Sequence, residues 1–246
     1  MYSEPIIRKS LREWWKRQRT ANGSFFATRK LAGLVWEFVR DSMPDRRRQR
    51  YGDVNYDWER RVDTTGATVG WRTRLLGLLH SSYQPIEPEL FREILGSLVV
   101  DFSRFTFIDI GSGKGRALLL AAEYPFRRIV GIELLPELNQ IARENIAKLS
   151  TSHWQGKSLE AIDATCGNAV DFDFPCEPLM VFLFNPLPEA ELITLVKNLD
   201  GSLRKDPRLV YVVYVNPVFA QTLGNSELLT ICSGTHQYAV FRTAVQ

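Results

Sequence analysis

Apolar residues recur along this chain in two patterns that predict alternating strands and helices in its central and C-terminal parts. Short apolar runs are typical of buried strands, and longer segments with apolar positions three or four residues apart are typical of helices. The predicted strands cover residues 105–110, 128–133, 159–164, 179–184, 209–215, 228–232 and 237–242. The predicted helices cover residues 88–98, 114–123, 135–149 and 189–203.

The spacing of these elements predicts the fold class. Helix-length segments separate most of the strands, which indicates a parallel sheet covered by helices on both faces. No such segment lies between the last two strands, so we expect an antiparallel edge. The sequence therefore predicts an α/β fold with a seven-stranded, mostly parallel sheet and an antiparallel edge strand.

The N-terminal part has a different pattern. Residues 5–19 and 25–41 each have the apolar spacing of an amphipathic helix, and residues 21–24 form a break between them. We therefore predict a helical extension over residues 1–50. Residues 51–246 are expected to form the main domain.

Charge is divided in the same way. Residues 1–50 contain 13 Lys/Arg and 5 Asp/Glu, whereas the rest of the chain contains 18 and 23. The extension is therefore basic and the body mildly acidic. Three interpretations of the basic extension stay open: a helical cap over the site, contact with an anionic membrane surface, and binding of nucleic acid.

Composition narrows the class of protein. The chain is 45% hydrophobic and 24% charged, which is ordinary for a globular domain. Residues 51–85 are rich in Gly, Thr, Tyr and Arg and are expected to be mostly loop. No apolar run approaches the roughly 18 residues that span a bilayer, and charges interrupt the N-terminal segment where a signal peptide is apolar. The three cysteines form no Cys-x-x-Cys pair and histidines are scarce, so we expect no metal site and a cytoplasmic protein.

The most specific motif follows the strand at 105–110. Asp109 ends this strand and is followed by glycines at alternate positions 111, 113 and 115. Glycines let a backbone approach a ligand closely, and the carboxyl ends of parallel strands are where α/β sheets bind ligands. A dinucleotide site has Gly-x-Gly-x-x-Gly, but here Arg116 stands where the third glycine belongs. An acid in this loop favours a cationic ligand without a pyrophosphate.

Glu133 ends the next strand, in the segment IVGIEL. A carboxylate at this position can accept hydrogen bonds from both hydroxyls of a ribose. Purely structural alternatives remain: the glycine segment as a simple turn, and Glu133 as a cap of the following helix.

DIGSGKGR followed by IVGIEL resembles the cofactor motifs of class I, Rossmann-like, S-adenosylmethionine-dependent methyltransferases, over about residues 83–243. The resemblance implies that S-adenosyl-L-methionine is the cofactor. Asn168 stands where the family often has an adenine-contacting Asp, and it can equally be a turn residue. The implied cofactor-binding residues are Asp109, Gly111, Ser112, Gly113, Gly115, Glu133, Leu134, Asn168, Ala169 and Gln84.

The acceptor end is less specific. Asn185 and Pro186 follow an apolar strand and are similar to the Asn-Pro-Pro-aromatic motif of amino-group methyltransferases, but Pro188 replaces the aromatic residue. Without that aromatic residue a nucleobase acceptor is disfavoured, and a plain turn remains an alternative. The resemblance also implies that the stretch around Tyr83 covers the cofactor. The predicted catalytic residues are therefore Asn185, Pro186 and Tyr83.

These observations together predict N-methylation of an amine on a protein, such as a lysine, or on a small molecule. Two alternatives are kept. One is an S-adenosylmethionine-binding partner protein without catalysis, and the other is a nicotinamide-dependent oxidoreductase.

Overall fold

A computed structural model describes most of the chain, in two compact units, Met1–Gln84 and Pro85–Gln246. The described residues are 3–41, 54–66, 84–151, 161–184 and 187–244. The predicted domain boundary at residue 50 falls outside them. No helix in the described parts of the chain combines the length and hydropathy needed to cross a bilayer.

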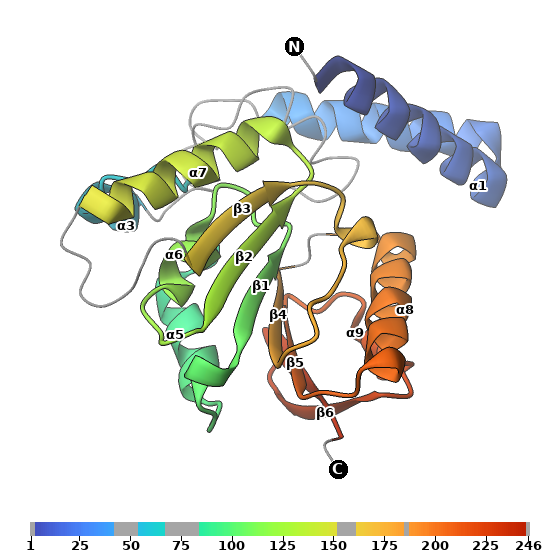
Figure 1. Ribbon diagram of the computed structural model, residues 1–246. Helices are drawn as coiled ribbons and strands as arrows, with labels where there is room; N and C mark the ends of the chain where they lie inside the picture. Colours follow the sequence, from blue (N-terminus) through green and yellow to red (C-terminus); the bar gives the residue numbers. More distant parts are fainter. Residues whose placement is uncertain (1–2, 42–53, 67–83, 152–160, 185–186, 245–246) are drawn as a thin grey trace. The chain divides into compact units, whose positions relative to one another are not determined.

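One seven-stranded sheet forms the centre of the second unit (Figure 1). Its strands are β1 (Thr106–Ile110), β2 (Arg128–Glu133), β3 (Ile162–Cys166), β4 (Leu179–Phe184), β5 (Val210–Val215), β6 (Leu229–Gly234) and β7 (Tyr238–Thr243). Their order is β3-β2-β1-β4-β5-β7-β6, and β7 is antiparallel to both of its neighbours. The predicted Rossmann-like, mostly parallel sheet with an antiparallel edge is confirmed.

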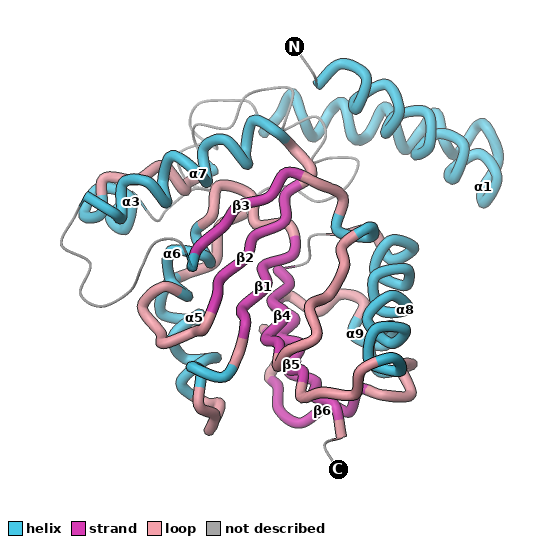
Figure 2. Tube along the Cα trace, viewed as in Figure 1, coloured by secondary structure: helices cyan, strands magenta, loops and turns pink. Residues whose placement is uncertain are grey.

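Helices cover both faces of this sheet (Figures 1 and 2). They are α5 (Pro88–Gly96), α6 (Arg116–Ala121), α7 (Pro136–Thr151), α8 (Glu189–Lys205) and α9 (Ala220–Gly224), with 3-10 helices η2 (Phe102–Arg104) and η4 (Ala169–Asp171). Helices α5 to α7 lie on one face, and α8 and α9 lie on the other. The predicted arrangement of helices is therefore also confirmed.

The two faces are packed differently. On the α8 side, aliphatic residues of the strands such as Ile108 and Leu183 join one core cluster with Leu195 of α8. On the other side the packing is aromatic, and the ring of Phe182 lies 5.4 Å from that of Phe91 and 5.8 Å from that of Phe107. Because both faces are buried, the strands are nearly uniformly apolar, which explains why the sequence predicted them well.

The sequence misplaced some elements. Strand β3 begins at Ile162, three residues later than predicted, and α6 is shorter at both ends than the predicted helix 114–123. Helix α9 was not predicted, because its five residues are too few to show a helical period. Most of β3 is exposed at the sheet edge, so its sequence lacks the continuous apolar run of the inner strands.

In the first unit, α1 (Ser3–Asp41) contains the break that the sequence predicted. Gly23 has φ 81° and ψ 165°, outside the helical region. The chain folds back there, since Lys30 Nζ donates to Gln18 Oε1 at 3.1 Å across twelve residues (Figure 2). The two predicted helices are thus the two halves of a helical hairpin, with a tighter connection than the sequence indicated.

Within the stretch expected to be mostly loop, the structure has one helix that was not predicted, α3 (Val54–Arg60). Buried Asp57 accepts hydrogen bonds from the backbone N–H of Thr64 at 2.7 Å and of Thr65 at 2.8 Å. The Thr64 hydroxyl donates to the same carboxylate. One acidic side chain therefore holds the turn that follows this short helix.

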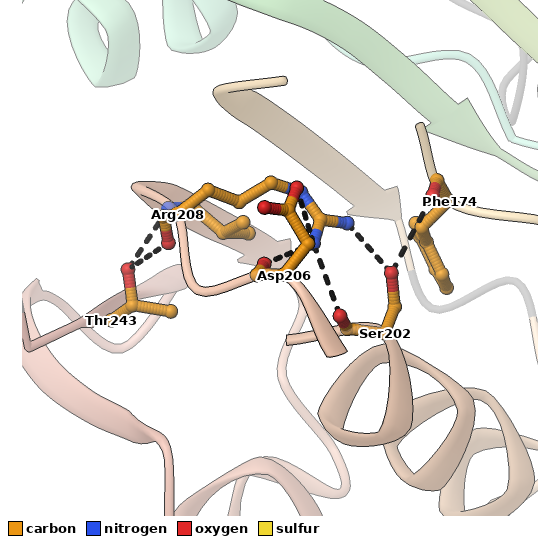
Figure 3. A network of polar contacts seen from close by, with 6 residues as sticks. Phe174, Ser202, Asp206, Arg208 and Thr243 are labelled. Carbon is orange, nitrogen blue, oxygen red and sulfur yellow. Dashed lines mark hydrogen bonds and ion pairs between the residues drawn. The ribbon is translucent and has the colours of Figure 1, made fainter. Parts of the chain in front are cut away.

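A buried arginine joins α8 to the start of β5 (Figure 3). The Arg208 side chain is 5% exposed, and it donates to Ser202 Oγ and to the Asp206 carbonyl at 2.8 Å each. Ser202 Oγ in turn lies 3.5 Å from the Phe174 carbonyl oxygen, and Thr243 Oγ1 donates to the Arg208 carbonyl at 2.9 Å. The guanidinium therefore donates hydrogen bonds to carbonyl groups at the C-terminal end of α8, where a positive charge is favourable.

Arg208→Met is expected to lower the free energy of unfolding by about 3 kcal/mol, because buried carbonyl groups lose a charged donor. Urea denaturation measures this as a lower midpoint at an unchanged slope. Arg204→Met is the matched control, since Arg204 is 56% exposed and pairs with the exposed Glu227. The control is expected to change stability by less than about 0.5 kcal/mol, and an equal loss in both variants would contradict the assigned role.

Candidate functional site

The glycine loop connects β1 to α6 at the carboxyl edge of the sheet. Gly111, Gly113 and Gly115 have φ of 74°, 55° and 84°. These left-handed conformations are unfavourable for residues with a side chain, so the loop requires glycine at all three positions. The alternate glycines of the sequence are therefore explained by backbone geometry.

Hydrogen bonds fix this loop to the end of β2. The backbone N–H groups of Gly111 and Ser112 both donate to the Ile132 carbonyl, at 2.8 and 3.0 Å. The N–H of Gly113 donates to Glu133 Oε2 at 2.8 Å. The other carboxylate oxygen, Oε1, accepts from the N–H of Leu135 at 2.8 Å. Glu133 thus orders both the glycine loop and the residue that precedes α7.

Asp109 and Glu133 lie on the same face of the sheet. Asp109 pairs in register with Gly131, and Glu133 follows two residues later on the same strand. Both side chains are buried, at 4% and 7% exposure. The structure therefore brings together the two acids that the sequence predicted as cofactor contacts.

Burial determines the protonation of this pair. Desolvation, followed by the nearby Glu133 carboxylate, raises the pKa of Asp109 to about 8. The pKa of Glu133 is also raised by desolvation, and hydrogen bonds from Leu135 and Gly113 oppose that shift. At neutral pH Asp109 is therefore mostly protonated in the ligand-free protein, and a cationic ligand would favour its ionised form.

Gly131 supports the loop from below. A Cβ at this position would lie 2.7 Å from both Leu118 Cδ1 and Ser112 Oγ. Strand β2 therefore needs a residue without a side chain where α6 and the loop cross it. The sequence shows Gly131 within IVGIEL, but the apolar pattern of the strand does not indicate that this position must be glycine.

Gly131→Ala is expected to lower the free energy of unfolding by about 2 kcal/mol, because the added methyl group collides with a packed helix and with the loop. Chemical denaturation of both variants measures the loss. Gly167→Ala is the control, since nothing lies within 4 Å of a Cβ there. Equal stability of the two variants would contradict the close contact.

The turn after β3 lies beside Glu133. The backbone N–H of Gly167 donates to the Glu133 carbonyl at 2.9 Å. Asn168 is exposed, and its Oδ1 accepts from the N–H of Val170 at 3.3 Å. Asn168 therefore has the turn role that was left open, at a position next to the second acid. Ala169 is buried in the core cluster, and Leu134 is 37% exposed.

Two buried asparagines near the loop, Asn139 and Asn145, were missed by the sequence analysis. Asn145 Nδ2 donates to the Lys114 carbonyl at 3.0 Å and so ties α7 to the loop. Ser112 Oγ and Asn139 Nδ2 are buried and have no hydrogen-bond partner among the described residues. The available signal was two asparagines within a helix, where this residue is unfavourable.

Other predicted residues are not placed by the structure. Tyr83, Asn185 and Pro186 lie outside the described residues, so their roles stay predictions. Gln84 is described and exposed, and it belongs to the first unit. Strand β4 ends at Phe184, beside β1, so the chain reaches residue 185 from the carboxyl edge.

Comparisons with known proteins agree with the predicted resemblance. No family model matches the chain. The release factor glutamine methyltransferase of Vibrio cholerae is 45% identical over 49 residues, which are 20% of this chain and 17% of that enzyme.

Solved structures of methyltransferases are similar to the chain in fold. An RNA methyltransferase from Salinibacter ruber in complex with S-adenosyl-L-homocysteine has 18% identity and a TM-score of 0.44, over 65% of this chain and 92% of that one. A SAM-dependent methyltransferase from Aquifex aeolicus has 12% identity and a TM-score of 0.46, over 65% and 100%. Identity at this level concerns the fold, and the activity has to be argued from the site.

Proposed function

We propose that this chain is an S-adenosylmethionine-dependent methyltransferase whose cofactor binds at the carboxyl edge of β1 and β2. One observation carries the proposal: two buried acids, Asp109 and Glu133, converge beside a loop of three positive-φ glycines. Two acids at a close backbone loop suit a ligand that has cationic groups and a ribose. A pyrophosphate would gain no cationic partner from these acids and would oppose their ionisation, which argues against a dinucleotide.

The residues present fit this cofactor. The loop glycines leave room for close approach of a ligand to the backbone. Ser112 Oγ and Asn139 Nδ2 lack a partner in the part of the chain that the structure describes, and buried polar groups in that state favour a bound polar ligand. Each oxygen of Glu133 accepts one backbone hydrogen bond and retains capacity for a ribose hydroxyl.

The cofactor, when bound, supplies an electrophilic methyl group on a sulfonium. The chain has to hold the donor, position an acceptor and exclude water. We assign the first role to Asp109, Glu133 and the glycine loop. For the second role we propose Asn185, whose side-chain oxygen would orient the lone pair of an amine, together with Pro186 and Tyr83. An amine on a protein or a small molecule is the proposed acceptor.

Calorimetry with S-adenosylhomocysteine tests the cofactor assignment, with NAD+ titrated in parallel. We expect saturable binding of the first ligand and none of the second. Absence of S-adenosylhomocysteine binding at millimolar ligand, with the protein folded, would reject the proposal. Binding of NAD+ alone would favour an oxidoreductase.

Transfer of a labelled methyl group from S-adenosylmethionine into a cell lysate tests catalysis. Label in protein or in small molecules, sensitive to Asn185→Ala, is the expected result. Cofactor binding without transfer would instead favour a binding protein that does not catalyse. Resolving the labelled products by size identifies the class of acceptor.

A further inference from the structure

The helical hairpin α1 has exposed aromatic side chains on its second half and exposed cationic side chains on its first half. Trp14 and Ala27 are buried at 7% and 0% exposure, one in each half of the hairpin. Large apolar side chains on the second half are nevertheless exposed, with Phe25 at 84% and Trp36 at 66%. Packing within the hairpin explains the apolar residues on the buried side of this helix. It does not explain those on the exposed side.

The two most exposed of the large apolar residues described in the hairpin, Phe25 and Trp36, share one helical face, and Phe26 and Val35 are exposed to either side of it at 46% and 51%. In the second half, positions 25, 29, 32 and 36 follow each other at intervals of four, three and four, so Phe25, Arg29, Ala32 and Trp36 form one stripe. Ala27 lies on the opposite side of the same helix. We call these four residues the aromatic stripe. It combines two large aromatic rings with one cation.

The first half has a cationic stripe. Arg8, Arg12, Lys16 and Arg19 are all exposed and also recur at intervals of three or four residues. Trp14 lies on a different face of that half. Between Ser3 and Asp41 the sequence contains nine Lys/Arg and four Asp/Glu. The hairpin is therefore basic overall, and its cations are concentrated in a row.

We infer that this hairpin is a docking surface for an anionic lipid bilayer. Basic amphipathic helices with exposed aromatic residues bind in the plane of the membrane interface, with the cations at lipid phosphates and the rings among the headgroups. The cations favour an anionic surface because their charge is complementary to it. The exposed rings of Phe25 and Trp36 favour a surface that has an apolar layer beneath its charged groups, as a lipid bilayer does. Phosphate contacts with a nucleic acid would use the cations but leave Phe25 in water.

Sedimentation of the full chain with lipid vesicles tests this inference. We expect binding to vesicles of 70% phosphatidylcholine and 30% phosphatidylglycerol at about 50 mM salt, at least tenfold stronger than to pure phosphatidylcholine. We also expect binding to fall steeply as salt rises, since exposed charges are screened. Equal binding to both vesicle types, or none to the anionic ones at low salt, would overturn the inference.

Variants separate the two stripes. Phe25→Ser with Trp36→Ser, and Arg12→Gln with Lys16→Gln and Arg19→Gln, are each expected to weaken vesicle binding by about tenfold or more. The aromatic control is Trp58→Ser, since Trp58 is also in the first unit and is 83% exposed.

The charge control removes three exposed cations of the second unit, in Arg143→Gln, Lys197→Gln and Lys205→Gln. Neither control is expected to change binding by more than about twofold. A loss in the cationic variant alone would mean a purely electrostatic association and would overturn the inference. So would displacement of the chain from vesicles by an equal concentration of RNA or DNA oligonucleotide.

Discussion

Glu133→Gln is expected to weaken S-adenosylhomocysteine binding by about a hundredfold. The carboxylate accepts hydrogen bonds from two backbone N–H groups, those of Gly113 and Leu135, both at 2.8 Å. A glutamine has one accepting oxygen, so its NH2 group would face one of these donors. The same change removes an acceptor and the negative charge from the proposed ribose contact. Losing one charge-assisted hydrogen bond to a ribose hydroxyl costs roughly 1.5–3 kcal/mol, and a hundredfold in affinity corresponds to about 2.7 kcal/mol. Calorimetry measures the change.

Glu227→Gln is the matched control, because it makes the same chemical change at a side chain that is 81% exposed. We expect wild-type affinity for that variant. Circular dichroism establishes that both proteins are folded before binding is compared. Unchanged affinity in Glu133→Gln would remove Glu133 from the site and weaken the proposed function itself.

Cofactor affinity is expected to rise with pH, by close to tenfold per unit between about pH 5.5 and 7.5. The cause is Asp109, whose pKa burial raises to about 8, so this group is protonated over most of that range. A cationic ligand favours the carboxylate, and the proton has to leave when the ligand binds. The affinity therefore increases as pH approaches about 8 and levels off above it. Calorimetry in buffers of different ionisation enthalpy measures the released proton.

Asp109→Asn is expected to remove most of this pH dependence. The pH dependence of the free energy of unfolding is a second test, and its direction can be predicted. Asp109 is protonated in the folded chain up to a pH of about 8 but has a pKa near 3.8 when unfolded. The folded state then holds the extra proton, so this group makes the free energy of unfolding fall as pH rises between about 4 and 8. A pH profile of Asp109→Asn parallel to that of the wild type would contradict the raised pKa.

The sheet could be predicted from sequence because its strands are buried on both faces. Residues 179–184 were predicted as a strand and form β4 with those bounds. Strand β3 was placed less well, because a mostly exposed edge strand has no such signature. Helix α3 was missed for a different reason. Its turn depends on Asp57 and two threonines, and such side chain to backbone hydrogen bonds leave no periodic pattern.

The residues of the candidate cofactor site could be predicted where a single residue type carries the chemistry. Asp109, Glu133 and the loop glycines were found because acids and glycines at strand ends are unusual. The burial of Ser112 and Asn139 was not predicted, since it depends on how α7 packs against the loop. The raised pKa of Asp109 has the same origin. This pKa is raised first by the burial of Asp109 and then by the carboxylate of Glu133 on another strand, 24 residues away in sequence.

Strand β7 follows β6 in the sequence, yet it is an interior strand of the sheet. It supplies the partner for both β5 and β6, which do not pair with each other. A nascent chain that has not yet released residues 238–243 therefore carries β5 with an open, strongly apolar edge. Edges of this kind pair readily with other chains. During translation the sheet therefore depends on residues 238–243, rather than on the glycine loop at its centre, to become resistant to aggregation.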